Sequence, residues 1–301
     1  MRLGLPKKKN VLLLIDKPDW AFDNCAKGFV PYLAPEFNID IQYVSQNPNL
    51  GIKKYDLIHV FFYAEDYYKQ FNLKGCKIIK EISSHRWEDT PPFGPRTPKD
   101  VYSDYLSDAD GVICVSERLY FIFNKYSRDT YFVPNGVDFE LFKPKHRLSG
   151  ELRFGWAGNP NDKVKGLNDF ILPAIQKRVE ILIAQNIKHE LMNEFYDKID
   201  ILLIGSKNEG EPIPLLESMA NGCFPITTDV GISGELIENY KNGIILKRRD
   251  KKELINAIDW CNNNIDHVRE MQEYNTNEIR KRRDWSICSQ YLKMAYNRTL
   301  N

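Results

Sequence analysis

Short apolar runs recur along the first half of the chain, and polar or turn-forming residues separate them. The six runs cover residues 10–16, 40–45, 55–62, 77–83, 111–116 and 130–134. Runs of this length predict strands of a parallel sheet that is covered on both faces. Amphipathic segments at residues 23–37 and 116–127 lie between some of the runs and predict helices. The alternation predicts βαβ units with right-handed crossovers.

The alternation stops between residues 133 and 151, where two prolines and an Asn-Gly pair interrupt any periodic element. It then begins again. The later strand-like runs cover residues 152–158, 179–184, 199–205, 224–228 and 243–247. We therefore predict two similar doubly wound α/β domains, residues 1–140 and 141–284, followed by an amphipathic helix at the C-terminus.

The overall composition agrees with two ordinary globular domains. The chain has 301 residues, of which 43% are hydrophobic and 28% are charged, and its net charge is +1. A nearly neutral chain creates no field that would attract nucleic acid, so we expect no nucleic-acid partner. The six cysteines form no CxxC pair, and the apolar run at residues 11–15 is too short for a signal peptide or a spanning helix. These features predict a cytoplasmic protein without a structural metal site.

The stretch NEGEPIPLLE, residues 208–217, is the most informative loop. It follows a predicted buried strand and leads into a helix that Pro214 starts and Gly222 ends. We expect Glu209 and Glu217 to line one pocket, where carboxylates accept hydrogen bonds from vicinal hydroxyls and the helix start binds phosphate. This combination predicts a nucleotide-sugar site. The alternative is that Glu217 only complements the helix dipole and Glu209 is solvated. The third acid, Glu211, is expected to face solvent.

Residues 209–237, EGEPIPLLESMANGCFPITTDVGISGELI, resemble the signature of retaining glycosyltransferases of family 4. The Glu-x7-Glu element of that family corresponds to Glu209 and Glu217. Segments 108–117, 133–138 and 155–166 resemble three further parts of the family in the same order. The resemblance extends from about Asp56 to Leu300. It implies the GT-B architecture, in which two Rossmann-like domains face a central cleft and the C-terminal helix, here residues 285–301, packs back on the first domain.

The resemblance also implies roles for individual residues. Glu209 would bind hydroxyls of the transferred sugar, and Glu217 would bind the ribose. Lys165 would bind the diphosphate and stabilise the charge of the leaving group. His85 would contact the donor sugar or the reacting centre; the alternative for a lone histidine is a structural role. His85, Lys165 and Glu209 are thus the expected catalytic residues. The remaining expected donor-binding residues are Gly158, Asn159, Lys163, Pro214, Leu215 and Leu216.

The sequence departs from the family pattern at two places. Many members have Gly-Arg where this chain has Gly158–Asn159, so Lys163 or an arginine from elsewhere would have to supply the missing charge. The segment between Lys165 and Glu209 is also shorter than in most members, which implies that a strand–helix unit is absent.

Two loops of the first domain are expected on the acceptor side of the cleft. Residues 16–24 contain Asp19 and Trp20, and residues 85–97 contain Arg86 and Trp87. Trp20 either stacks on a sugar acceptor or packs in the core. His59 lies inside an apolar run and is expected to be a hydrogen-bonded core residue.

These observations together predict a retaining, metal-independent hexosyltransferase without a cofactor. Its donor would be a UDP- or GDP-sugar, and its acceptor a glycan, a lipid-linked molecule or a small molecule, in the synthesis of a surface polysaccharide or glycoconjugate. The basic runs at residues 247–252 and 280–284 are solvated faces or contacts to anionic lipid at the inner face of the membrane. The alternatives are a non-catalytic nucleotide-sugar-binding protein and a GT-B nucleotide-sugar epimerase.

Overall fold

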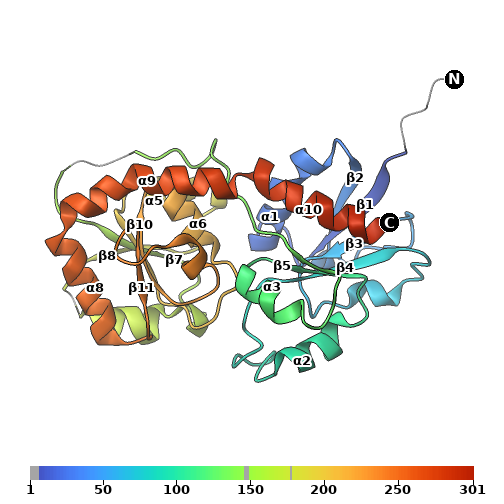
Figure 1. The fold of residues 1–301 in the computed structure, drawn as a ribbon, viewed down its shortest axis with the longest axis horizontal. Helices are drawn as coiled ribbons and strands as arrows, with labels where there is room; N and C mark the ends of the chain where they lie inside the picture. The colour runs from blue at the N-terminus through green and yellow to red at the C-terminus, as the bar shows by residue number, and fades with distance from the viewer. Residues whose placement is uncertain (1–6, 146–148, 177) are drawn as a thin grey trace.

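Two parallel β-sheets form the centre of the molecule, and helices cover their faces (Figure 1). The structure is a computed structural model that describes residues 7–145, 149–176 and 178–301. The strand order is β2-β1-β3-β4-β5-β6 in the first sheet and β11-β10-β9-β7-β8 in the second. All strand pairs within these two sheets are parallel. The prediction of two doubly wound α/β domains is therefore confirmed.

The first sheet forms because its strands are apolar on both faces. Residues 11–15 of β1 are all buried, as are all four residues of β3 and of β5. The strands are β1 (Lys9–Ile15), β2 (Phe37–Tyr43), β3 (Leu57–Val60), β4 (Lys77–Ile82), β5 (Gly111–Cys114) and β6 (Thr130–Phe132). The α-helices between them are α1 (Ala21–Leu33), α2 (Pro98–Val101) and α3 (Glu117–Phe123). Each strand of the sheet lies within or beside one of the six predicted runs.

The second sheet is smaller, with five strands instead of six. Its strands are β7 (Phe154–Ala157), β8 (Ile181–Ala184), β9 (Ile201–Ile204), β10 (Phe224–Thr228) and β11 (Ile244–Leu246). Its α-helices are α4 (Leu172–Ile175), α5 (Met192–Tyr196), α6 (Ile213–Ala220), α7 (Ser233–Leu236), α8 (Lys251–Asn263) and α9 (Ile265–Arg283). Strand β8 is the edge of this sheet, and its Leu182 and Ile183 are exposed.

Helix α9 runs along the second domain, and helix α10 (Trp285–Leu300) continues onto the first domain (Figure 1). Asp284 separates the two helices with an extended backbone and caps α10 by accepting the N–H of Ser286 at 2.8 Å. Leu292 and Tyr296 of α10 are buried in the core of the first domain, which also contains residues of α1. We propose that residues 285–301 belong with residues 1–140 and that residues 141–284 form the second domain.

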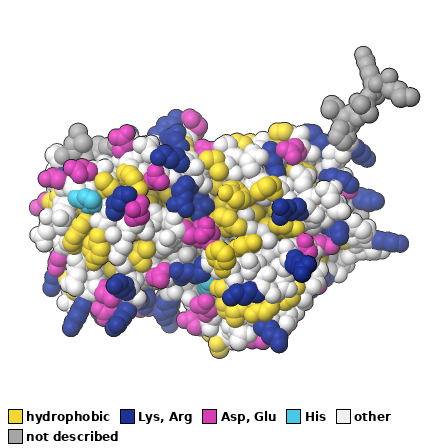
Figure 2. Space-filling model, in the orientation of Figure 1, with side chains coloured by type: hydrophobic (Ala, Val, Ile, Leu, Met, Phe, Trp, Pro, Cys, Tyr) yellow, Lys and Arg dark blue, Asp and Glu magenta, His cyan; other side chains and the backbone are white. Residues whose placement is uncertain are grey.

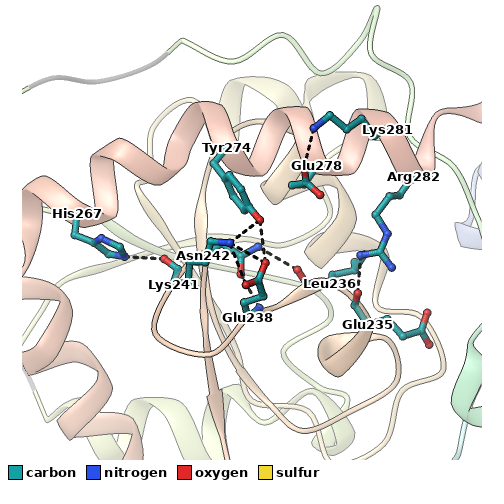
Figure 3. Close-up of polar contacts among 10 residues, drawn as sticks. All are labelled: Glu235, Leu236, Glu238, Lys241, Asn242, His267, Tyr274, Glu278, Lys281 and Arg282. Carbon is teal, nitrogen blue, oxygen red and sulfur yellow. Dashed lines mark hydrogen bonds and ion pairs between the residues drawn. The ribbon is translucent and has the colours of Figure 1, made fainter.

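Side-chain contacts join α9 to α7 and to the loop between α7 and β11 (Figure 3). Lys241 contacts Glu238 at 2.9 Å and the hydroxyl of Tyr274 at 3.0 Å, and Arg282 donates to the carbonyl of Glu235 at 2.7 Å. Arg283 is buried and bonds Glu235 at 3.0 Å. The expectation that residues 280–284 form a solvated basic face is therefore wrong for Arg283, because its guanidinium is buried between acidic groups of the second domain.

The surface carries charges of both signs. Figure 2 shows lysine and arginine side chains interspersed with aspartate and glutamate on the face drawn there. Within the part of the chain that the structure describes, no helix is long and apolar enough to cross a bilayer.

Candidate donor site

Lys165 and Glu209 meet at the edge of the second sheet. Lys165 follows β7 and Glu209 follows β9, and these two strands are neighbours. Because parallel neighbours end at the same edge of a sheet, the loops after them come together. The Nζ atom of Lys165 lies 2.6 Å from Oε1 of Glu209, and the hydroxyl of Ser206 donates to the same oxygen at 2.9 Å. The two side chains are 24% and 11% exposed, so solvent weakens this ion pair only partly.

A glycine fixes the direction of Lys165. Gly166 has φ +76°, and a Cβ atom at this position would overlap the carbonyl oxygen of Gly205. Only glycine therefore allows the loop after β7 to lie against the loop after β9. The single turn Lys163–Lys165 is capped by Asp162, whose Oδ1 accepts the N–H of Val164 at 3.0 Å.

A small pocket opens beside the ion pair, between the ends of β7 and β9 and the start of α6. Its lining residues are Trp156, Ala157, Lys165, Leu203, Ile204, Ser206, Glu209, Pro212 and Pro214. Of the expected donor-binding residues, Lys165, Glu209 and Pro214 thus lie together. Leu215 and Leu216 follow directly on α6, but their side chains are completely buried in the core of the second domain.

The other expected donor residues lie on the loop after β7, residues 158–166, which we call the phosphate loop. The N–H of Gly158 donates to the carbonyl of Ala184 at 3.0 Å. Asn159 is exposed, and its Oδ1 accepts the N–H of Asn161 at 3.0 Å. Lys163 is also exposed. In this loop, therefore, Lys165 is the cation that points to the pocket.

Glu217 has partners that the sequence did not reveal. It lies in the second turn of α6, and its two oxygens bond Nε2 of His189 at 2.7 Å and the hydroxyl of Tyr196 at 2.8 Å. Burial lowers the pKa of His189, but the hydrogen bond and the charge of Glu217 outweigh burial, so this pKa is raised above its ordinary value. His189 had no recognisable partner in the sequence, because 28 residues separate it from Glu217.

His85 follows β4 of the first domain and is 4% exposed. Its Nδ1 lies 3.0 Å from Oε1 of Glu88, and its ring stacks on Trp87 with 5.7 Å between centroids. Its Nε2 is buried without a hydrogen-bond partner among the described residues. Such an atom is costly unless a ligand satisfies it. His85 therefore has one nitrogen held by the protein and one nitrogen available.

Two of the residues expected on the acceptor side, Trp87 and Trp20, differ sharply in solvent exposure. Trp87 is 3% exposed and packs edge-to-face on Phe123 in a hydrophobic cluster, so the expectation that Trp87 faces an acceptor is corrected. Trp20 is 49% exposed, with Nζ of Lys17 at 3.9 Å from its ring centroid. The core alternative for Trp20 is therefore wrong. Asp19 precedes it and is also exposed.

Glu211 does not face solvent. It is buried, and its Oε2 accepts hydrogen bonds from the backbone N–H of Asn135 at 2.9 Å and from the side-chain amide at 2.7 Å. Nε of Arg283 lies 3.7 Å from its other oxygen. Burial raises the pKa of Glu211 to about 8, although Arg283 and the hydrogen bonds from Asn135 oppose this shift. Glu211 thus joins the second domain to the segment that leaves the first.

The prediction for His59 is confirmed. It is fully buried, and its Nδ1 lies 2.9 Å from the hydroxyl of Tyr296 on α10. Burial lowers its pKa to about 3, so the imidazole is neutral. His59 therefore belongs to the core and not to the site.

The two domains touch across the site. A Cβ atom on Gly210 would overlap the carbonyl oxygen of Ser83, which follows β4. The side-chain amide of Asn208 bonds Asp89 of the loop that carries His85. Groups of three or more His, Cys, Asp or Glu side chains able to hold a metal ion do not occur among the described residues.

Comparison with known proteins agrees with this geometry. Residues 167–278 match the family described as glycosyl transferases group 1. An uncharacterized glycosyltransferase of Methanocaldococcus jannaschii is 24% identical over 219 residues, which are 63% of this chain. The chain spans 60% of the length of that curated relative.

Solved structures share the fold at low sequence identity. Sucrose-phosphate synthase from Thermosynechococcus elongatus has a TM-score of 0.78 at 14% identity, over 97% of this chain and 99% of its own. Anabaena HepE in complex with UDP and glucose has a TM-score of 0.69 at 15% identity, over 96% of this chain and 99% of its own. Residues 167–278 thus match a group 1 glycosyltransferase domain, in a chain whose two parallel-sheet domains have a GT-B-like fold.

Proposed function

We propose that this protein transfers a sugar from a nucleoside-diphosphate sugar to an acceptor hydroxyl with retention at the anomeric carbon. The observation that carries the proposal is the pair of Lys165 and Glu209, 2.6 Å apart beside a pocket at the carboxyl edge of the second sheet. A cation and a hydroxyl-binding carboxylate at one point suit the diphosphate and the sugar of such a donor. The match of residues 167–278 to group 1 glycosyltransferases supports the same reaction class.

In this proposal the donor replaces contacts that the side chains make with each other. Lys165 leaves Glu209 and binds the diphosphate, where it stabilises the negative charge that develops as the anomeric C–O bond breaks. Glu209, still held by Ser206, accepts hydroxyls of the sugar. Glu217 accepts the ribose hydroxyls, and His189 and Tyr196 keep its carboxylate oriented.

His85 completes the catalytic group from the opposite domain. Its available Nε2 binds a hydroxyl of the donor sugar, while Glu88 holds Nδ1. We propose a front-face substitution. The acceptor oxygen forms a bond to the anomeric carbon on the face from which the phosphate departs, and the acceptor proton passes to the departing phosphate oxygen.

The finer substrate assignments are also proposals. UDP-glucose is the first donor to test, because Anabaena HepE was solved with UDP-glucose, and a GDP-sugar is the second. Trp20 and Asp19 are exposed and suit an acceptor glycan, a lipid-linked acceptor or a small molecule. We propose a hexosyltransferase of surface polysaccharide or glycoconjugate synthesis, in the cytoplasm or at the inner face of the membrane, that needs no metal or cofactor.

The test is a donor screen with product analysis. The protein is incubated with UDP-glucose, UDP-N-acetylglucosamine or GDP-mannose, and the released nucleoside diphosphate is measured with and without candidate acceptors. Nuclear magnetic resonance of the product then gives the anomeric configuration. Release of nucleotide together with an α-linked product from an α-linked donor supports the proposal. Binding without turnover would instead indicate a non-catalytic protein, and an altered nucleotide sugar without acceptor would indicate an epimerase.

A further inference from the structure

The phosphate loop has one cation directed to the pocket, Lys165. Asn159 is uncharged, and it occupies the loop position that could otherwise carry a second cation. A nucleoside diphosphate carries more than one negative charge, and a lysine meets it only as a point charge. The proposed donor site therefore needs a second positive group from another part of the molecule.

Arg86 brings a positive charge to this loop from the first domain. It follows His85 in the loop after β4, and its Nη2 lies 2.5 Å from Oδ2 of Asp162 in the phosphate loop. The side chains of Arg86 and Asp162 are 32% and 22% exposed, so the contact is partly shielded from solvent. This ion pair joins residues 76 positions apart in the sequence.

Arg86 and Lys165 act on the same carboxylate. Burial raises the pKa of Asp162, but the hydrogen bond and charge of Arg86, the hydrogen bond from the N–H of Val164 and, least, the charge of Lys165 outweigh burial, so the pKa is lowered from its ordinary value. The bond to Asp162 also occupies only one of the five N–H donors of the guanidinium. The remaining donors can form the paired bonds that phosphate oxygens accept.

Arg249 is the other arginine near the phosphate loop, and it suits this role less well. Its Nε donates to the carbonyl of Gly205 at 2.9 Å, and its Nη2 bonds Asp169 at 2.8 Å. Its guanidinium also stacks on Phe170 at 4.8 Å. Arg249 therefore holds the backbone beside Gly166 in place, whereas Arg86 has one partner that a ligand can replace.

We propose that Arg86 binds the diphosphate of the donor from the first domain, beside Lys165, and that Asp162 holds Arg86 when no donor is bound. This inference rests on the proposed function and adds a donor-phosphate-binding residue to it. Both cations are then held by carboxylates, Lys165 by Glu209 and Arg86 by Asp162, until the donor arrives. Donor binding is thereby linked to contact between the two domains, because its two cations come from opposite sides of the cleft.

The test compares the binding of UDP and uridine by calorimetry in the full-length protein. A charge-assisted contact to phosphate predicts that Arg86→Ala weakens UDP binding by about tenfold or more and leaves uridine binding unchanged. Arg86→Lys restores part of the loss, because the charge returns without the planar fork. Circular dichroism and the melting temperature check that each variant is folded.

Two controls separate a phosphate contact from a structural ion pair. Asp162→Asn keeps the cap on Val164 but releases Arg86, so UDP binding should stay within about threefold of wild type or become tighter. Arg118→Ala removes a second ion pair between the domains, in which Nη2 of Arg118 lies 2.6 Å from Asp229 outside the phosphate loop. We expect Arg118→Ala to weaken UDP binding by less than about threefold.

Several outcomes would overturn the inference. UDP binding by Arg86→Ala at wild-type strength would remove Arg86 from the site. An equal loss in Asp162→Asn or in Arg118→Ala would show that Arg86 acts only as a link between the domains. In each of these cases wild-type binding and turnover leave the proposed function intact. A wild-type protein that binds none of UDP, GDP and ADP would instead refute the proposed function itself, and the role of Arg86 with it.

Discussion

The proposed donor side and the proposed acceptor side are built in opposite ways. On the donor side, Lys165 and Glu209 are largely buried and bonded to each other, and Glu217 is held by two further side chains. On the acceptor side, Trp20 is 49% exposed. Groups that must stabilise charge need fixed positions and little water around them, whereas a surface that receives a varied acceptor does not. Under the proposed function, the difference would place the fixed charges for the donor in the second domain and the contacts to the acceptor on the exposed loop that carries Trp20.

Replacing the two tryptophans of the first-domain loops, Trp87 and Trp20, should give the largest difference in the free energy of unfolding. Trp87→Ala should lower the free energy of unfolding by about 3–5 kcal/mol, because it leaves a cavity beside Phe123. Trp20→Ala should change it by less than about 0.5 kcal/mol, because the ring is exposed. Urea unfolding measures both. Trp20→Ala should also raise the KM for acceptor without changing UDP binding, and equal destabilisation by the two variants would contradict the assignment.

Removing Lys165 tests whether the donor side is catalytic. We expect Lys165→Ala to lower kcat/KM by about a hundredfold, because the leaving phosphate loses its main stabilising charge. Glu209→Ala should lower it by at least about tenfold. Initial rates of nucleotide release measure both effects. Lys207→Ala, an exposed lysine in the loop after β9, is the matched control and should retain its rate. Near-normal turnover in Lys165→Ala would place the reaction elsewhere.

The pKa of Glu211, which lies at the domain boundary, predicts how the stability of the protein depends on pH. Its pKa is about 8 in the folded protein and near 4.5 when unfolded, so between these values the folded state keeps a proton that the unfolded state has lost. The contribution of Glu211 to stability is therefore fully present below about pH 4.5 and is lost as the pH rises from there to about 8. The melting temperature should therefore fall as the pH rises, by about 2–4 °C for each kcal/mol of stability that is lost. Glu211→Gln should remove part of this fall.

Glu81 complicates this measurement, because burial also raises its pKa to about 8. Glu81 remains in the variant, so the pH dependence should be reduced and not abolished. Glu273→Gln, at an exposed carboxylate of α9, should leave the pH profile unchanged. An unchanged slope in Glu211→Gln would mean that Glu211 is ionised in the folded protein.

Replacing His189 by alanine should give the smallest change in the free energy of unfolding. Its raised pKa means that its bond to Glu217 stabilises the folded protein fully below the unfolded pKa near 6.5 and that this contribution is lost as the pH rises through the folded pKa. His189→Ala should therefore cost about 1 kcal/mol at pH 6 and less at pH 8.5. Urea unfolding at the two pH values measures this cost. The control is the same measurement on His267→Ala, a histidine variant on α9. A cost that grows with pH would show that His189 is neutral at its bond to Glu217.

Local pattern was sufficient to predict the strands and the loop that carries Glu209, and the family resemblance added Lys165; their ion pair was not predicted. Lys165 and Glu209 each follow a predicted strand, and the rule that ligands bind beyond the carboxyl ends of parallel strands places them at one edge. Helices α8 and α9 were not predicted, although Leu254, Ala257, Ile258 and Cys261 have helical spacing and are buried. Their many charged residues were interpreted as charge runs and not as parts of helices.

The sequence by itself determined the architecture, because apolar runs between turn residues leave few ways to bury a parallel sheet. The donor-side motif came from the resemblance to family 4. Tertiary structure alone decided which polar residues meet. Glu211 is buried against Asn135, and Arg86 reaches Asp162, across 76 residues of chain in each case. Such contacts depend on how two domains face each other, and no local periodicity records that arrangement. For the same physical reason, the contact of Arg86 with the phosphate loop is visible only in the tertiary structure.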